Sequence, residues 1–362
     1  MNALSRFAAS RWVRLGAFAL LLVVLAVLPL VADPYTNQTV SHIAFVAVAI
    51  MGLNVVMGYT GQVSLGHSFF VGVGAYAAII PIRDLWGGPL AEGAIVLGFL
   101  LSAIVPGILG LLIALVAVRL RGLALAMVTI ALPTIGVPLA QRFSDWTGGN
   151  EGVSIRQLPW VDAAGETHRA NPFAAGPGLE NDQWQYYLVM IVSVAFFVLA
   201  YFLVRGKFGR AFAIVKSNEA IAASMGISPY RYKVLAFTIA AVYGGVAGFL
   251  LVVWGQYTSS ETLAFHHSIA YVIATIVGGA GSILGSVLGG AFYVVVDPVL
   301  NSLDLAVYSA VIQGLVILVI LFLLPGGLAS LPRTIRRLAR RRRGGPSVGS
   351  DFQPDSAVPT TK

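Results

Sequence analysis

Six long apolar runs dominate this chain, each about the length needed to cross a lipid bilayer. They are Leu15–Ala32, Ile43–Met57, Ala94–Val118, Tyr186–Val204, Val234–Trp254 and Leu305–Leu324. A helix needs about 20 apolar residues to cross the hydrocarbon core, and open backbone cannot be left unpaired in lipid. The runs also lack the alternation of barrel strands. The sequence therefore predicts an all-α, polytopic integral membrane protein built as a helical bundle with Gly-broken helices.

Placing helices between the charged loops predicts about ten transmembrane helices, with eight or nine as the alternative, and both termini in the cytoplasm. The expected spans are residues 15–32, 42–57, 67–82, 94–118, 123–141, 185–204, 234–254, 267–278, 284–297 and 305–324. The third and the eighth are short or rich in glycine, so either could be re-entrant or broken. The first lacks a small-residue cleavage site after it, which favours a retained helix over a secretory signal.

The basic residues support this topology. All but four of the 23 lysines and arginines fall on the predicted cytoplasmic side, as the positive-inside rule requires. The four exceptions are Arg83, Arg142, Arg156 and Arg169. Much of the net charge of +8 lies in the run RTIRRLARRRR (333–343), directly after the last apolar run. This position indicates topology or contact with anionic lipid of the bilayer, and no binding to nucleic acid.

The domain organisation follows from these spans. Residues 1–331 are expected to form one transmembrane domain, with an outer loop at 142–184 that carries a short helix and a cytoplasmic loop at 205–233. Residues 332–362 form a tail that is first basic and then small and polar, a composition typical of disorder.

One segment inside the apolar region is polar and rich in glycine: GYTGQVSLGHSFFVGVGAYAA (58–78). Non-helical backbone at membrane depth is tolerated only where it is buried in protein or lines a watery cavity. A second such segment, GGAGSILGSVLGGAF (278–292), lies in the C-terminal half. Interrupted helices in corresponding halves indicate a transport pathway. The candidate pathway residues are Gly58, Thr60, Gly61, Gln62, Ser64, Gly66, His67, Gly279, Gly281 and Ser282.

Close helix packing is the alternative interpretation of these glycines, because small residues let helix backbones approach. We expect packing to explain most of Gly72–Ala78 and Gly244–Gly248. For His67, packing and contact with a solute both stay open. His266 and His267 are expected at the outer membrane boundary.

The predicted cytoplasmic loop contains a second informative stretch, GRAFAIVKSNEAIAASMGISPYRYKVLAF (209–237). Residues 211–215 and 220–225 favour helix, Gly226 suits a helix C-terminus, and Pro229 prevents continuation. Short helices at the membrane surface could dock a soluble partner or could simply connect two spans.

Several classes of function are disfavoured by what the sequence lacks. The only Gly-Lys pair, Gly206–Lys207, has Tyr201 and Phe208 where a phosphate-binding loop needs Gly and Ser or Thr, so the chain itself should not bind or hydrolyse ATP. Acidic residues are almost absent from the spans, which disfavours ion-gradient coupling. No catalytic cluster of histidines or carboxylates is apparent and there is no cysteine, so we expect no catalytic residue, no metal site and no cofactor.

Several motifs in one order resemble the LivM-type permease subunits of bacterial ABC importers for branched-chain amino acids, a family that includes urea and short-amide permeases. The motifs are GLNVVMGYTGQVSLGHSFFVGVGAYAA, RLRGLALAMVTIAL (119–132), DWTGGNEGVS (145–154), residues 209–248 and IVGGAGSILGSVLGGAF. The resemblance covers about residues 53–331.

This resemblance implies a permease that forms half of a translocation pathway in the bacterial cell membrane. Its implied partners are a homologous LivH-type permease, two cytoplasmic ABC ATPases that bind the ATP, and an extracytoplasmic solute-binding protein. The segment with Glu219, Ala220, Ala223 and Gly226 corresponds to the coupling helix that contacts the ATPase. Here the glycine follows the glutamate by seven positions, whereas the general pattern has six. Branched-chain amino acids are the expected solutes, with urea or short amides as the alternative and a gradient-driven transporter or channel as the less favoured mechanism.

Overall fold

The computed structural model of the protein describes residues 11–86, 91–120, 122–161, 167–174 and 179–303, together with scattered positions between 311 and 331. Its helices are α2 (Arg11–Val31), α3 (Pro34–Asn54), the π-helix η1 (Val55–Tyr59), α4 (His67–Leu85), α5 (Ala91–Ala117), α6 (Leu123–Arg142), α7 (Ser144–Thr147), α8 (Asn181–Arg205), α9 (Lys207–Ser217), α10 (Glu219–Ser224), α11 (Pro229–Gly255), the 3₁₀-helix η2 (Ser260–Leu263), α12 (Phe265–Gly278), α13 (Ile283–Ser302) and the 3₁₀-helix η4 (Leu328–Ser330). Its strands are β1 (Val153–Ser154), β2 (Leu158–Val161), β3 (Thr167–Ala170) and β4 (Tyr257–Thr258).

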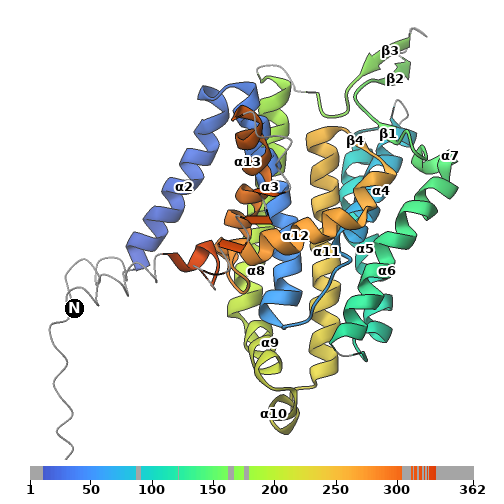
Figure 1. The fold of residues 1–362 in the computed structure, drawn as a ribbon. Helices are drawn as coiled ribbons and strands as arrows, with labels where there is room; N and C mark the ends of the chain where they lie inside the picture. Colours follow the sequence, from blue (N-terminus) through green and yellow to red (C-terminus); the bar gives the residue numbers. More distant parts are fainter. Residues whose placement is uncertain are drawn as a thin grey trace, which may run out of the picture.

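The described helices form the predicted membrane bundle (Figure 1). Seven candidate spans are long and apolar enough to cross a membrane: α3 with η1, α4, α5, α6, α8, α11 and α13. The polytopic helical fold is therefore confirmed. Nine of the ten predicted spans coincide with described helices when α2 and α12 are included. The tenth, residues 305–324, and the tail 332–362 lie largely or wholly outside the described residues.

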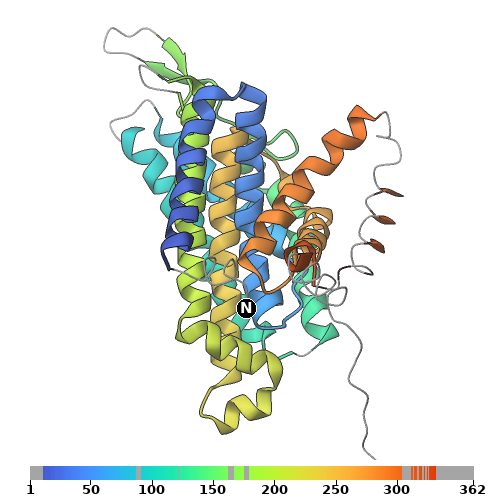
Figure 2. The same cartoon turned by 90° about the vertical axis from the view of Figure 1, so that its left-hand side faces the viewer.

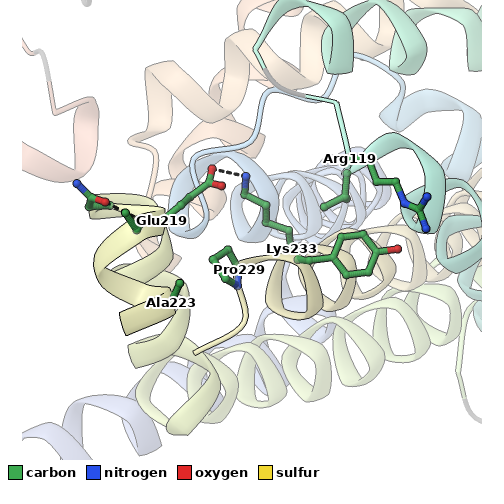
Figure 3. Close-up of a pocket in the computed structure, with 9 residues that line it drawn as sticks. Arg119, Glu219, Ala223, Pro229 and Lys233 are labelled. Carbon is green, nitrogen blue, oxygen red and sulfur yellow. Dashed lines mark hydrogen bonds and ion pairs between the residues drawn. The ribbon is translucent and has the colours of Figure 1, made fainter. Parts of the chain in front are cut away.

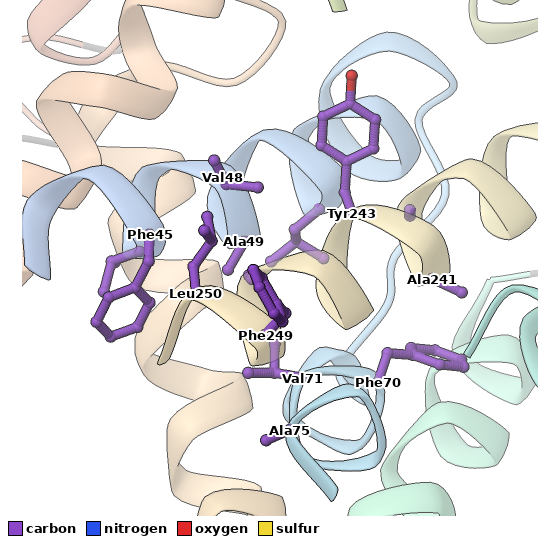
Figure 4. Packing of buried hydrophobic residues seen from close by; sticks show 14 of the residues in the cluster. Phe45, Val48, Ala49, Phe70, Val71, Ala75, Ala241, Tyr243, Phe249 and Leu250 are labelled. Carbon is purple, nitrogen blue, oxygen red and sulfur yellow. The ribbon is translucent and has the colours of Figure 1, made fainter. Parts of the chain in front are cut away.

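The centre of the bundle is built by α3 and α11, the two spans with the largest buried share, 78% each. Phe45 and Val48 of α3 pack near Phe249 and Leu250 of α11, and α4 and α5 also pack against α11 (Figure 4). Small residues allow these helices to approach closely, since a methyl group at Gly74 of α4 would overlap the backbone of α11. The packing interpretation of the glycines in α4 and α11 is thus confirmed.

The two ends of the bundle differ in charge and structure. Helices α9 and α10 protrude at one end, called here the basic end, and the hairpin β2–β3 lies at the other, called here the hairpin end (Figures 1 and 2). The lysines and arginines of α9 and of the start of α11 lie at the basic end, whereas Arg169 lies in β3 and Arg156 just before β2, at the hairpin end. The positive-inside rule predicts that the basic end faces the cytoplasm.

The outer loop 142–184 is more structured than its sequence indicates. The predicted short helix is present as α7, but the loop also contains strands that the sequence analysis does not predict. Strand β1 pairs with β4 and β2 pairs with β3, both in antiparallel register. Strands of two to four residues are too short to show a clear period in the sequence.

The predicted eighth span is a partial crossing. Helix α12 has 14 residues, about 21 Å of helix against the roughly 30 Å of a hydrocarbon core. It runs across the bundle, and α13 then turns back toward the hairpin end (Figures 1 and 2). The expectation of a broken or re-entrant eighth span is therefore confirmed. The third span is a continuous helix, α4, of 19 residues.

Candidate functional site

The first break in the helices begins where α3 loses its regular pitch. The chain continues from α3 into the π-helix η1 and leaves it at Thr60, and π-helical turns are frequent at functional sites. Two hydrogen bonds stabilise the end of η1. The backbone amide of Gln62 donates to the Val56 carbonyl at 3.0 Å, and the Thr60 hydroxyl donates to the same oxygen at 2.7 Å. Gly61 has a φ of 72°, a left-handed conformation that glycine adopts most easily.

The second break separates α12 from α13. Gly279 and Gly281 have φ values of 120° and 83°, which reverse the chain between the two helices. Ser282 then caps α13, because its hydroxyl accepts a hydrogen bond from the Gly285 amide at 3.3 Å. The residues expected at this break thus perform the turn and the cap.

Asn54, at the end of α3, joins the two breaks directly. Its side-chain oxygen accepts from the Gly281 amide at 2.6 Å. Its side-chain nitrogen donates to the Ser282 carbonyl at 2.9 Å and to the Ser286 hydroxyl at 3.0 Å. Asn54 is fully buried, so these bonds satisfy an amide that has no access to water. Sequence reasoning missed this residue, which lies in an apolar run four positions before Gly58.

Gly58 is held in the same contact. A methyl group on Gly58 would overlap both the side-chain oxygen of Asn54 and the amide of Gly281. Of the predicted pathway residues, the structure therefore brings Gly58, Gly281 and Ser282 together. The close approach explains why this position requires glycine.

The polar residues after η1 are buried rather than exposed. Thr60, Gln62, Ser64 and His67 each expose 5% or less of their surface. The Gln62 side chain donates to the Thr60 hydroxyl at 2.9 Å and to the Lys233 carbonyl at 3.4 Å. Its own oxygen has no hydrogen-bond partner among the described residues. A buried polar atom left open in this way could bind a polar solute or a water molecule.

The end of this extended segment is fixed to α6. The Leu65 amide donates to the Thr129 hydroxyl at 3.0 Å, and a methyl group on Gly66 would overlap the Thr129 carbonyl. The first break is therefore held against α6 at Gly66 and against the second break at Gly58.

His67 begins α4 inside the helical core, between Gly52 of α3 and Gly244 of α11. Its ring makes an edge contact with Tyr271 at a centroid distance of 6.2 Å. Its Nε2 atom has no hydrogen-bond partner among the described residues. The surroundings show a packing role, and the unpaired nitrogen is compatible with a polar contact as well.

The starts of α4 and α12 meet through a pair of serines. The hydroxyls of Ser68 and Ser268 lie 2.6 Å apart, and the Ser68 amide donates to the Ser268 hydroxyl at 2.9 Å. Both serines follow a histidine, at 67 and 267.

The cytoplasmic loop forms the two short helices that the sequence predicts, α9 and α10. Asn218 separates them and caps α10, since its side chain accepts from the Ala220 and Ile221 amides at 2.8 and 3.2 Å. Gly226, with φ of 77°, follows the end of α10 as expected. Lys233, at the start of α11, forms an ion pair with Glu219.

The outer surface of α10 is apolar and accessible. Ile221 and Met225 expose 53% and 63% of their surface, whereas Ala222 is fully buried. A cavity of about 810 Å³ lies beside this helix, lined among others by Arg119, Ala223 and Lys233 (Figure 3). Of the predicted coupling residues, Glu219, Ala220 and Ala223 line this cavity, and Gly226 does not. Sequence reasoning missed Ile221 and Met225, the two large apolar side chains on the accessible face.

One group of described residues has the donor atoms for a metal ion. Glu261, His266 and His267 place one ligand atom each within 4.8 Å of one another, at the start of α12. Glu261 and His266 are exposed and His267 is half-buried.

The comparison with protein families gives the decisive observation. Residues 35–321 match the family model described as the branched-chain amino acid transport system permease component. The chain belongs to this family. This LivM-type chain is a permease subunit of an ABC importer and a multi-pass protein of the bacterial inner membrane.

Individual relatives agree with the family assignment. The chain is 30% identical over 299 residues to the high-affinity branched-chain amino acid permease LivM of Escherichia coli K12, covering 78% of this chain and 67% of that protein. It is 23% identical to LivH of the same strain, covering 79% of this chain and 91% of LivH. The autoinducer 2 import permease LsrC of Klebsiella pneumoniae is 29% identical over 49% of each chain. The family resemblance inferred from the motifs is thereby confirmed.

Proposed function

We propose that this chain forms half of the translocation pathway of an ATP-driven importer for branched-chain amino acids. Its proposed partners are a LivH-type permease, two cytoplasmic ABC ATPases and an extracytoplasmic solute-binding protein. The observation that carries the proposal is the direct contact between the two helix breaks, at Gly58 and Gly281. The first break also lies against α9, one of the two short helices at the basic end. Broken helices of this kind provide transporters with their solute-binding backbone groups.

The proposed ATPase docking surface is the accessible face of α10. Exposed Ile221 and Met225 offer apolar contact at a position that faces the cytoplasm. The Asn218 cap and the Glu219–Lys233 ion pair both hold the N-terminal end of the helix. A rigid helix with an apolar face can enter a groove on a partner protein. The chain itself, which has no phosphate-binding loop, would leave ATP hydrolysis to that partner.

The contacts between the cytoplasmic helices and the two breaks suit a mechanism in which the pathway opens alternately to the two sides of the membrane. Closure of the ATPase dimer on ATP would displace α9 and α10, and the displaced helices would shift the first break at Thr60–Gly66. Because Asn54 ties this break to Gly281, the second break would move as well. The bundle would then open outward to accept a solute, and hydrolysis would reset it.

The proposed solute class rests on family membership and on the polarity of the breaks. Backbone groups of unwound helices suit the ammonium and carboxylate of an amino acid. The same groups could bind urea or a short amide, which need only hydrogen bonds, and this is the second candidate solute class. The unpaired oxygen of Gln62 is compatible with either.

Transport by the reconstituted complex tests both the ATP-driven mechanism and the solute class. The chain would be purified with its permease partner, ATPases and binding protein, placed in liposomes, and supplied with labelled leucine or labelled urea in parallel. We expect leucine uptake that requires ATP and the binding protein. Liposomes loaded with a non-hydrolysable ATP analogue serve as the control.

Each alternative outcome points to a different correction. Uptake of urea alone would keep the ATP-driven mechanism and replace the solute. Uptake of either solute by this chain without ATPases would contradict the importer and favour a channel or a gradient-driven carrier.

A further inference from the structure

Lys216 connects the cytoplasmic loop to the first helix break. It lies near the end of α9, and its Nζ atom donates a hydrogen bond of 2.6 Å to the carbonyl of Gly58 in η1. Its aliphatic stem runs beside Gly61, where a methyl group would lie 3.1 Å from Lys216 Cγ. Among the described residues Lys216 forms no ion pair with a carboxylate. The Lys216 ammonium therefore donates to a backbone carbonyl, and charge-assisted hydrogen bonds of this kind are stronger than neutral ones.

The neighbouring cations of α9 do not reach the break. Lys207 lies over the ring of Phe208 at 5.2 Å. Arg210 donates to the carbonyl of Arg205 at 3.5 Å. Both interactions stay within α9 and the end of α8, so a general need for positive charge in this loop does not explain the placement of Lys216.

The carbonyl that Lys216 contacts belongs to the residue wedged between the breaks. Gly58 lies against Asn54 and Gly281, and Asn54 bonds to Gly281 and Ser282. An unbroken series of contacts thus runs from α9 through Gly58 and Asn54 to the turn between α12 and α13. Coupling between distant sites is carried by contiguous contacts of this type.

The α10 helix has a second, weaker link to the same segment. Glu219 pairs with the Lys233 side chain, and the Lys233 carbonyl accepts from Gln62 at 3.4 Å. This link reaches the break after Gly61, whereas Lys216 reaches it at Gly58. The hydrogen bond from Lys216 to Gly58, at 2.6 Å, is shorter than the one from Gln62 to Lys233, at 3.4 Å. It is also the bond whose acceptor residue contacts Gly281.

We propose that Lys216 is a positioning residue that transmits movement of the α9–α10 loop to both helix breaks. This proposal rests on the proposed importer function and assigns the transmission to one side chain. A displaced α9 pulls or releases the Gly58 carbonyl, and the Asn54 bonds carry the change to the α12–α13 turn. Transport is then coupled to ATP hydrolysis through the lysine ammonium.

The test compares Lys216→Met with the wild type in the full reconstituted importer. Methionine keeps the apolar stem and removes the donor, so assembly should be unaffected. The matched control is Lys207→Met, which makes the same change on the same helix. We expect Lys216→Met to keep its ATPase rate while the amount of solute imported per ATP falls to about a tenth, and Lys216→Arg to restore most of it because a cation is retained.

Hydrogen exchange supplies a readout that does not depend on transport. In Lys216→Met the amides of residues 61–66 and 279–282 should exchange faster than in the wild type, and in Lys207→Met they should not. Faster exchange at the first break alone would overturn the transmission to the second.

The outcomes separate this inference from the proposed function. Normal import per ATP by Lys216→Met, in an importer whose wild type works, would overturn the role of Lys216 and leave the importer intact. A wild-type complex without ATP-driven import would overturn the proposed function itself, and the coupling role with it.

Discussion

At the residue scale, Asn54 and Gly58 show which part of the site the sequence could reveal. The glycines are visible in the sequence because they interrupt an apolar run, and they were predicted at the breaks. Asn54 was not predicted, because its partner Gly281 lies 227 residues away and a lone asparagine gives no sign of such a contact. A long-range hydrogen bond depends on the tertiary fold, which local periodicity does not encode.

Replacing Asn54 with alanine should destabilise the bundle. The change removes three buried hydrogen bonds and leaves the Gly281 amide without its partner, so we expect a loss of about 3 kcal/mol. Thermal unfolding of the purified protein in detergent measures it. The control is Asn301→Ala, at an exposed position near the end of α13, which should leave the midpoint unchanged.

Gly58→Ala should be harmful although alanine favours helix. The added methyl group would overlap the Asn54 side chain and the Gly281 amide, and overpacking of this kind costs about 1–3 kcal/mol. The control is Gly255→Ala, where nothing lies within 4 Å. If both variants unfolded at the same temperature and transported equally, the close contact between the breaks would be wrong.

At the element scale, helix ends were predicted better than helix partners. The end of α10 follows from Gly226 and Pro229, residues with known local preferences, whereas the capping residue Asn218 was not predicted. The eighth span was counted as a crossing with a broken or re-entrant segment as the alternative, and the 14 residues of α12 favour the alternative. The pairing of α12 with the start of α4 was missed, since it depends on the Ser68–Ser268 contact.

A charge on the accessible face of α10 should uncouple the importer. Ile221→Glu places a carboxylate on the proposed ATPase docking surface at a side chain that is 53% exposed, so folding should be little affected. We expect ATPase activity in the complex to persist while its stimulation by the loaded binding protein is lost. Ile221→Met keeps the apolar contact and should behave as wild type. Transport at the wild-type rate by Ile221→Glu would remove α10 as the coupling element.

At the scale of the whole molecule, the charge distribution predicted the arrangement of the ends. Among the described residues, the lysines and arginines of α9 and of the start of α11 lie at the end where α9 and α10 protrude, and the hairpin β2–β3 lies at the opposite end (Figure 2). The orientation itself stays a prediction, and it depends on a sum over loops rather than on any single contact. The outer strands were missed because strands of two to four residues show no clear period in the sequence.

Labelling of single cysteines tests the orientation. The chain has no cysteine, so Ser154→Cys in β1 and Ser224→Cys in α10 each introduce a unique thiol at an exposed position. A membrane-impermeant maleimide added to intact spheroplasts should label the cysteine at 154 and not the one at 224. Inside-out vesicles should give the reverse pattern, and the same pattern in both preparations would contradict the topology.

The central pairing of α3 with α11 has a consequence for biosynthesis. The end of α11 lies about 200 residues after the end of α3, a stretch that takes roughly 10–40 s to translate at about 5–20 residues per second. During that interval α3, α4 and α5 reside in the membrane with the face for α11 still uncovered. Newly made chains must therefore be shielded by lipid, by the insertion machinery or by one another until residue 255 has emerged.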